Sequence, residues 1–264
     1  MILINGDKLQ QDHFPDKTLN IKVYENHKTC VDIQWNYEND AELFTIICLR
    51  KHLEGKIVTL TMPYLPHARM DRVKRHEDVF TLKYFCETIN SLNFKKVIIL
   101  DPHSNVGPAL LDRVEIRSAE SAISSAIGDV LWDVGKEEEL AVFYPDEGAM
   151  KRYSDFAQLP YGFGVKKRDW TTGKIQNLEV INAPAIRDKA VLIIDDICSR
   201  GGTFYYSAKA IKEYTDKDIY LYITHCEETI LEGDLIKSGL IKKIYTANPL
   251  FEIPTEYQDI IIEI

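Results

Sequence analysis

The feature that most constrains the fold is the stretch from Val191 to Thr203, which reads VLIIDDICSRGGT. Four consecutive aliphatic residues, 191–194, are typical of a strand that is buried on both faces of a parallel sheet. The paired Asp195 and Asp196 then fall at the carboxyl end of that strand, the edge where open α/β sheets bind their ligands. We therefore expect an α/β protein with a ligand site directly after this strand.

The glycine turn that follows predicts a phosphate-binding loop. Gly201 and Gly202 allow backbone N–H groups to approach an anion closely, and Thr203 is expected to be the N-cap of a helix whose apolar residues recur at helical spacing over 204–211. Backbone donors and the helix dipole attract phosphate, and neighbouring carboxylates accept hydrogen bonds from sugar hydroxyls. The alternative interpretation is that the acids and glycines form only a turn.

Short apolar segments alternate with segments of helical pattern along the chain, and this alternation predicts an α/β fold with mainly parallel sheets. The expected strands are 56–62, 97–100, 140–144, 190–194 and 220–223. The expected helices are 41–53, 81–92, 118–127, 148–157 and 203–214. The acidic stretch 129–139 is the predicted boundary between two domains, 1–128 and 129–264. The weakly patterned stretch 169–188 is predicted to be a mobile loop or a hairpin.

Composition excludes several classes of protein. The net charge of −9 argues against broad electrostatic binding to nucleic acid or to an anionic membrane. Five widely spaced cysteines without a CxxC pair argue against a disulfide framework and a structural zinc, which favours a reducing cytoplasm. The first residues lack a basic leader, and no apolar run reaches bilayer-spanning length. We expect a cytoplasmic protein that binds neither nucleic acid nor membrane.

Polar side chains follow four of the expected strands. They fall in the segments 63–72, 101–105, 145–148 and 195–196. Because the carboxyl ends of parallel strands can face a common crevice, carboxylates, a histidine and arginines could converge there on one phosphate-bearing substrate and its metal. The alternative is that these are ordinary solvated loop residues.

Several of these segments carry motifs of one enzyme family. The motifs are Pro63-Tyr64 with Ala68-Arg69-Met70-Asp71-Arg72, then Asp101-Pro102-His103, Tyr144-Pro145-Asp146-Glu147-Gly148, Lys166-Lys167-Arg168 and Thr224-His225. Together with the 195–203 segment, they resemble the ribose-phosphate diphosphokinases, or phosphoribosyl pyrophosphate synthetases, over most of residues 55–250. A phosphoribosyltransferase would share only the 195–203 segment, so the upstream motifs favour the diphosphokinase.

The resemblance implies a fold and a reaction. The family fold has two phosphoribosyltransferase-like α/β domains with the site between them, and the final strand is expected either in the second domain or packed on the first. The family assembles into homo-oligomers, dimers or larger. Its reaction passes the β,γ-diphosphoryl group of Mg-ATP to the anomeric hydroxyl of ribose 5-phosphate, giving AMP and the phosphoribosyl pyrophosphate used in nucleotide biosynthesis.

The resemblance also implies residue roles on the nucleotide side. Arg69, Asp71, Arg72 and His103 would bind ATP, and His103 and Asp146 would also lie near Mg²⁺. Lys166 and Arg168 would be catalytic, closing over the transferring group in a flexible segment and stabilising its developing charge.

The acceptor side follows the motif in the same way. Asp195 and Asp196 would hold the ribose hydroxyls. The 5′-phosphate loop would consist of Ser199, Arg200, Gly201, Gly202 and Thr203.

That loop departs from the family pattern, because Ser199 and Arg200 stand where the family has aspartate and threonine. The exchange makes the loop more positive by about two charges, and a guanidinium can grip a phosphate or diphosphate with two hydrogen bonds. Two acceptors are therefore expected: ribose 5-phosphate, or ADP-ribose, as in ADP-ribose pyrophosphate synthetases that serve NAD synthesis. A non-catalytic relative and a base-transferring phosphoribosyltransferase are the further alternatives.

Overall fold

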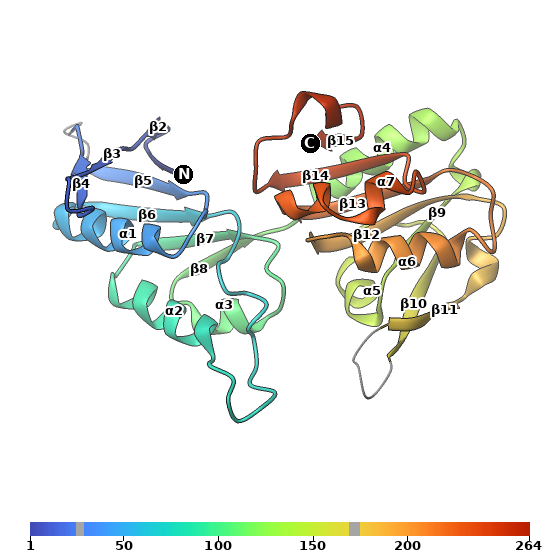
Figure 1. Cartoon of the computed structure of the whole chain (residues 1–264), viewed down its shortest axis with the longest axis horizontal. Helices are drawn as coiled ribbons and strands as arrows, with labels where there is room; N and C mark the ends of the chain where they lie inside the picture. The colour runs from blue at the N-terminus through green and yellow to red at the C-terminus, as the bar shows by residue number, and fades with distance from the viewer. Residues whose placement is uncertain (25–28, 169–174) are drawn as a thin grey trace. The chain divides into compact units, whose positions relative to one another are not determined.

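The computed structural model describes residues 1–24, 29–168 and 175–264, and it describes residues 166–168 and 175–177 by their backbone only. The chain divides into two compact units, Met1–Ser118 and Ala119–Ile264, and each is built on its own sheet (Figure 1). Most neighbouring strands in the two sheets are parallel. The predicted α/β class with mainly parallel sheets is confirmed.

The first unit contains a six-stranded sheet in the order β2-β1-β5-β6-β7-β8. The strands β5 to β8 are parallel to one another, and β1 pairs antiparallel with β5. The bounds are β1 (Ile2–Ile4), β2 (Asp7–Lys8), β5 (Cys30–Trp35), β6 (Ile57–Met62), β7 (Lys96–Leu100) and β8 (Val114–Arg117). A separate hairpin consists of β3 (Gln10–His13) and β4 (Leu19–Lys22).

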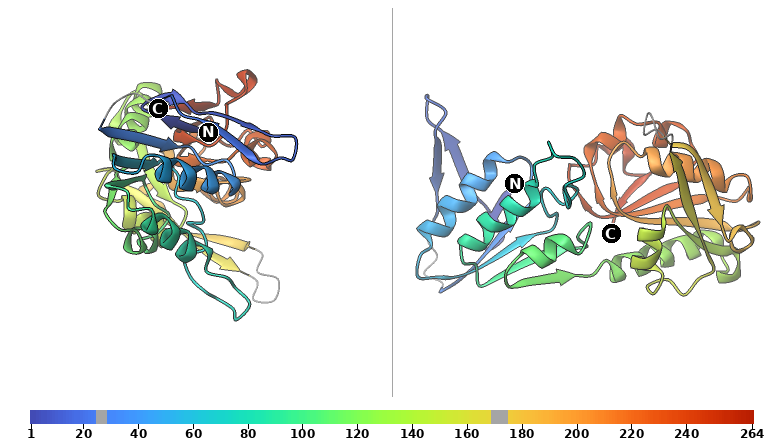
Figure 2. Two further views of the ribbon diagram at one scale, coloured as in Figure 1. Left: turned by 90° about the vertical axis from the view of Figure 1, so that its left-hand side faces the viewer. Right: turned by 90° about the horizontal axis from the view of Figure 1, so that it is seen from below.

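Helices cover one face of this first sheet. The helices α1 (Ala41–His52), α2 (Thr81–Ser91) and α3 (Val106–Leu110) connect successive neighbouring strands, and right-handed crossovers place such helices on the same side. Figure 2 shows them side by side along the sheet. The unit accordingly has one apolar core, and buried and exposed residues alternate along β5 because only one of its faces is covered.

The second unit contains a seven-stranded sheet in the order β11-β10-β9-β12-β13-β14-β15. Among the strands that the structure describes in this sheet, only the β10–β11 pair is antiparallel. The bounds are β9 (Leu140–Tyr144), β10 (Tyr161–Arg168), β11 (Ile175–Ile181), β12 (Ala190–Cys198), β13 (Ile219–Cys226), β14 (Lys243–Pro249) and β15 (Ile261–Glu263). Every residue of β9 and β13 is buried, because apolar cores lie on both faces.

In the described residues of the second unit, four helices flank the sheet. They are α4 (Glu120–Val134), α5 (Glu147–Tyr153), α6 (Gly202–Ile211) and α7 (Asp234–Lys237), with 3-10 turns at η1 (Glu137–Glu139), η2 (Ala183–Ala185), η3 (Glu228–Leu231) and η4 (Thr255–Tyr257). The helices belong to two different apolar cores. Residues of α4 and α5 contribute to one core, and residues of α6 and α7 contribute to the other. This two-sided cover explains the continuous aliphatic run at 191–194.

The division between the units differs from the predicted boundary. It falls at Ser118/Ala119, whereas residue 128 lies inside α4, whose Ile123 and Val130 are buried in a core of the second unit. A helical pattern marks the apolar face of a helix but not the sheet that it covers. The final strand, β15, pairs with β14 in the second unit.

Three smaller expectations can also be compared with the structure. The stretch 169–188 contains β11, which forms a hairpin with β10, while residues 169–174 lie outside the described part. The five cysteines are free thiols. Within the described ranges, no helix combines the length and the apolar character needed to cross a membrane.

Candidate active site

The two predicted ribose-binding acids lie inside β12. The sequence placed them after the strand, but β12 continues to Cys198 and pairs with β13 up to the Cys198–Cys226 register. Hydrogen bonding to the neighbouring strand extends the strand through polar residues that an apolar pattern does not include. Successive residues of a strand point to opposite faces, and Asp196 is buried whereas Asp195 is half-buried.

Three carboxylates gather at the ends of two neighbouring strands. Because β9 and β12 are adjacent, with Phe143 opposite Ile193, Asp146, the second residue after β9, lies near Asp195 and Asp196. The Asp196 N–H donates to Oδ1 of Asp195 at 3.0 Å. Burial, together with the carboxylates of Asp196 and Asp146, raises the pKa of Asp195 well above its usual range. The cluster is therefore a place where added positive charge would be stabilising.

Arg152 contacts this cluster, and the sequence prediction did not include it. The Arg152 Nη1 atom lies 3.3 Å from Oδ2 of Asp196, and the Arg152 side chain is 29% exposed. Arg152 is in the last turn of α5, the helix that Asp146 begins by accepting a hydrogen bond from the Ala149 N–H at 3.1 Å. The signal that could have revealed it is a basic residue on the short helix that the motif aspartate caps.

The predicted phosphate loop turns sharply from β12 into α6. Gly201 is the N-cap, with φ at +75°, and α6 begins at Gly202. The prediction that Thr203 is the N-cap was wrong, because the left-handed turn at Gly201 starts the helix earlier and Thr203 lies in its first turn. The first N–H groups of α6 have no carbonyl partner within the helix, so the geometry suits an anion.

Ser199 and Arg200, the two residues that depart from the family pattern, both contact a second segment of the chain, residues 229–232. The hydroxyls of Ser199 and Thr229 are 3.2 Å apart. The Arg200 Nη2 donates to Oε2 of Glu232 at 2.9 Å, with the two side chains 73% and 60% exposed. Arg200 is thus at the loop surface, where its partner can be exchanged.

In the first unit, the predicted nucleotide residues follow two neighbouring strands, β6 and β7. Asp71 is buried, accepts a hydrogen bond from Arg72 Nε at 2.9 Å, and is hydrogen-bonded to Ser104. Burial alone would raise the pKa of Asp71, but Arg72, Ser104 and the nearby His103 outweigh it and hold the pKa below its usual value. The structure therefore brings Asp71, Arg72 and His103 together. Arg69 is exposed in the same segment.

The remaining predicted residues divide into two groups. The backbone of Lys166 and Arg168 lies in the β10–β11 hairpin, and their side chains lie outside the described part, so their catalytic role stays a prediction. His225, which belongs to the Thr224-His225 motif and was given no role above, is buried and lies with its Nδ1 3.0 Å from Asn248 Nδ2. That arrangement agrees with a structural histidine.

In the described ranges, no three His, Cys, Asp or Glu side chains are grouped closely enough to hold a metal ion without further ligands. Mg²⁺ commonly binds through one or two carboxylates, several waters and substrate phosphates. Asp146 and Asp195 offer that kind of donor set.

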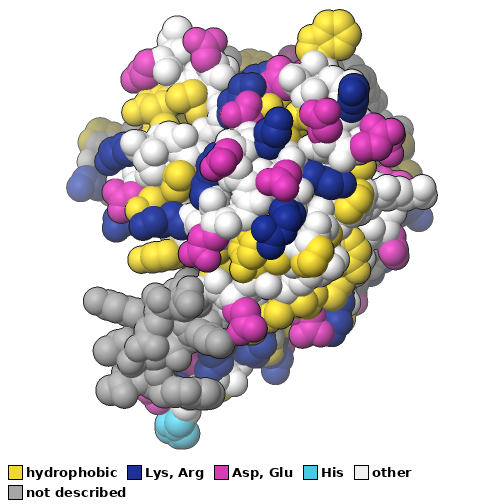
Figure 3. Space-filling model, turned by 90° about the vertical axis from the view of Figure 1, so that its right-hand side faces the viewer, with side chains coloured by type: hydrophobic (Ala, Val, Ile, Leu, Met, Phe, Trp, Pro, Cys, Tyr) yellow, Lys and Arg dark blue, Asp and Glu magenta, His cyan; other side chains and the backbone are white. Residues whose placement is uncertain are grey.

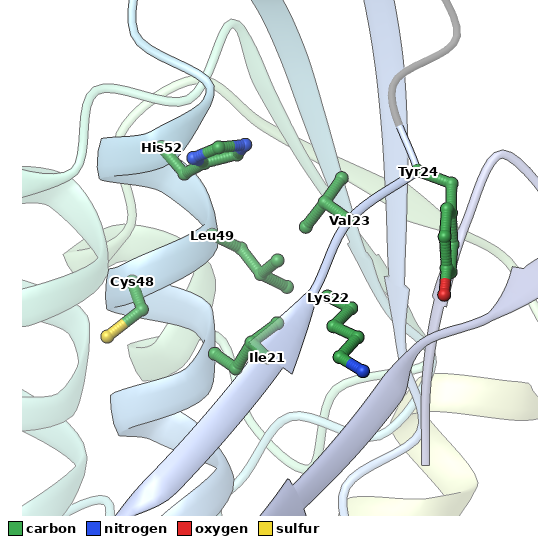
Figure 4. A pocket seen from close by; sticks show the side chains of 7 residues that line it. All are labelled: Ile21, Lys22, Val23, Tyr24, Cys48, Leu49 and His52. Atoms are coloured by element: carbon green, nitrogen blue, oxygen red, sulfur yellow. The ribbon is translucent and has the colours of Figure 1, made fainter.

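Neither the surface charges of the second unit nor the cavity described in the first unit identifies a further residue of this site. On the face in Figure 3, acidic and basic side chains are interspersed, which fits an anion site built locally from the backbone. A cavity of about 550 Å³ lies in the first unit, between residues 21–24 and the Cys48, Leu49 and His52 side chains of α1 (Figure 4). Its described lining contains none of the predicted site residues.

Comparison with known proteins first defines the class of fold. The structure is similar to phosphoribosylpyrophosphate synthetase from Mycobacterium smegmatis, with a TM-score of 0.75, 17% sequence identity, and coverage of 94% of this chain and 82% of that chain. This likeness confirms the fold expected from the motifs. No family model matches the chain.

The sequence relatives are more specific. The chain is 25% identical to ribose-phosphate pyrophosphokinase from Sulfurisphaera tokodaii, over 94% of this chain and 87% of that relative. It is 27% identical to ribose-phosphate pyrophosphokinase from Pyrococcus abyssi, over 94% and 85%. The predicted resemblance to the ribose-phosphate diphosphokinases is confirmed, and it spans nearly the whole chain.

Proposed function

We propose that this protein is a diphosphokinase that transfers the β,γ-diphosphoryl group of ATP to the anomeric hydroxyl of ribose 5-phosphate, giving phosphoribosyl pyrophosphate and AMP. The observation that carries the proposal is the cluster of Asp146, Asp195 and Asp196 beside the glycine turn that opens α6. The similarity to ribose-phosphate pyrophosphokinases over most of the chain supports the same reaction.

The carboxylate cluster fits Mg²⁺. Its donors are oxygens, which this ion prefers, and a divalent cation would offset the repulsion that Asp195 experiences from Asp196 and Asp146. In the second unit, Asp146 and Asp195 would hold the ion, and for His103 in the first unit a role near Mg²⁺ is proposed from the family resemblance alone. When bound, Mg²⁺ would neutralise charge on the phosphate oxygens during transfer.

The other roles follow from chemistry and position. Asp195 and Asp196 would accept hydrogen bonds from the ribose hydroxyls, and the N–H groups at the start of α6 would hold the 5′-phosphate. Arg69, Arg72 and His103 would bind ATP phosphates, with Asp71 fixing the Arg72 guanidinium through its 2.9 Å hydrogen bond. Lys166 and Arg168 would stabilise the charge that spreads over the transferring oxygens.

Production of AMP tests this proposal. Purified protein with Mg-ATP and ribose 5-phosphate should form AMP and phosphoribosyl pyrophosphate in equal amounts, and Lys166→Ala should lose most of that activity while remaining folded. Lys217→Ala is a matched control, because Lys217 is exposed and lies just before β13, at the opposite end of that strand from the Thr224-His225 motif. Absence of AMP with the wild type, under conditions where a characterised diphosphokinase is active, would favour the non-catalytic alternative.

ADP-ribose is the second candidate acceptor, and Arg200 is the observation that favours it. The exposed pair with Glu232 leaves its guanidinium at the loop surface, where a second phosphate on the acceptor could replace the carboxylate. Parallel AMP assays with ribose 5-phosphate and ADP-ribose decide between them. Higher kcat/KM for ADP-ribose that falls in Arg200→Ala supports this candidate, and equal or better use of ribose 5-phosphate excludes it.

A further inference from the structure

We propose that Gly233 and Thr229 are positioning residues for the phosphate loop, Ser199 to Thr203. They belong to the segment 227–235, which we call the bracing segment. This inference rests on the proposed function, because it assumes that the loop binds the phosphate of the acceptor. Nothing in the sequence motifs points to the bracing segment, since it lies beyond β13 and far from the loop along the chain.

The bracing segment contacts the loop at several points. The Glu227 N–H donates to the Cys198 carbonyl at 2.8 Å, just before the loop begins. The Thr229 hydroxyl lies 3.2 Å from that of Ser199, and Thr229 also hydrogen-bonds Oε2 of Glu227 at 3.5 Å. The loop is therefore supported from one side by the bracing segment.

Gly233 makes the closest approach. A Cβ atom at this position would collide with the carbonyl oxygen of Arg200 and lie 2.9 Å from its carbonyl carbon. The backbone of Gly233 has φ −74° and ψ 176°, a conformation that any residue adopts. Glycine is thus required by the contact with the loop rather than by the local backbone conformation.

The contact controls the orientation of one peptide plane. The Arg200 carbonyl and the Gly201 N–H belong to the same planar unit, so they move together. A Cβ added at Gly201 would lie 2.8 Å from Leu235, which also belongs to the bracing segment. The bracing segment therefore lies against the backbone at both ends of this plane. Pushing its carbonyl outward would turn the next N–H groups, those that open α6, away from a bound phosphate.

The first experiment measures the loop directly. Gly233→Ala is compared with Gly128→Ala, whose added Cβ meets nothing within 4 Å, and both are checked for folding by circular dichroism. Amide hydrogen exchange in peptides covering 199–205 should accelerate about tenfold in Gly233→Ala and stay unchanged in Gly128→Ala. Unchanged exchange in folded Gly233→Ala overturns the inference, whatever the protein binds.

The second experiment measures ligand binding. The Kd for ribose 5-phosphate, measured by calorimetry on the full chain, should rise about tenfold in Gly233→Ala, whereas KM for ATP stays within about twofold. Thr229→Val should weaken ribose 5-phosphate binding about threefold, and Thr229→Ser should restore it. Equal weakening of ATP and acceptor, or no weakening of either, contradicts a positioning role.

The two experiments separate this inference from the function on which it rests. If the wild type binds no ribose 5-phosphate while exchange in the loop still responds to Gly233→Ala, the proposed acceptor fails and the bracing role stands. If the wild type binds ribose 5-phosphate and neither variant changes exchange or affinity, the bracing role fails and the proposed function stands.

Discussion

The pair formed by Arg152 and Asp196 gives the sharpest prediction about the carboxylate cluster. Arg152→Ala leaves Asp196, a residue only 4% exposed, without the cation that lies 3.3 Å away and beside two other acids. At an effective dielectric constant of about 20, a pair at this distance attracts by roughly 5 kcal/mol. Desolvation and the partial exposure of Arg152 oppose this, so we expect a net loss of about 2 kcal/mol from the stability of the second unit.

A matched pair provides the comparison. Arg200 and Glu232 are also in contact, at 2.9 Å, but both are exposed, so Arg200→Ala should cost about 0.5 kcal/mol or less. Hydrogen exchange of the amides in β12 reports the difference, because 2 kcal/mol corresponds to about 30-fold faster exchange. Amides of β6, in the separate core of the first unit, serve as the internal control. Equal effects of the two substitutions on β12 would refute the reasoning.

Two further predictions concern the second unit. Burial would raise the pKa of Asp133, but Lys243 and Lys242 outweigh burial and lower it, so ionised Asp133 stabilises the fold above the unfolded-state pKa of about 3.9. The free energy of urea unfolding should therefore be about 1 kcal/mol lower in Asp133→Asn at pH 7, and the difference should shrink as the pH falls below about 4; a constant difference would argue against this ion pair. Gly201→Ala combines a positive φ with a clash at Leu235, so thermal unfolding should show a loss of about 2 kcal/mol and KM for the acceptor should rise; an unchanged Tm and KM would contradict the strained turn.

Much of the second unit could be predicted from the sequence because its strands are buried on both faces. Continuous aliphatic runs such as 140–144 and 190–194 have few other interpretations, and β9 matches its predicted bounds. The strand β5 in the first unit alternates exposed and buried residues, CVDIQW, and was not predicted. A short alternation of polar and apolar residues that no glycine or proline borders resembles an ordinary loop until the neighbouring strands in the sheet are known.

The candidate site shows the same division between local and distant information. Asp195, Asp196 and Gly201 could be predicted because they adjoin a strong strand pattern. Arg152 was not predicted, although its position on the helix that Asp146 caps was a usable signal. Gly233 could not be predicted, because its importance depends on a contact with a residue far along the chain. The Gly233 contact in particular leaves no periodic pattern, since its backbone conformation is open to any residue.

The central claim is the transfer of an intact diphosphoryl group, and the fate of the two terminal phosphates of ATP tests it most directly. Phosphorus NMR of a reaction with Mg-ATP and the preferred pentose phosphate should show a diphosphate attached to the anomeric carbon, with AMP as the nucleotide product. Formation of ADP with a single transferred phosphate, or unchanged ATP in the presence of either acceptor, would contradict the account.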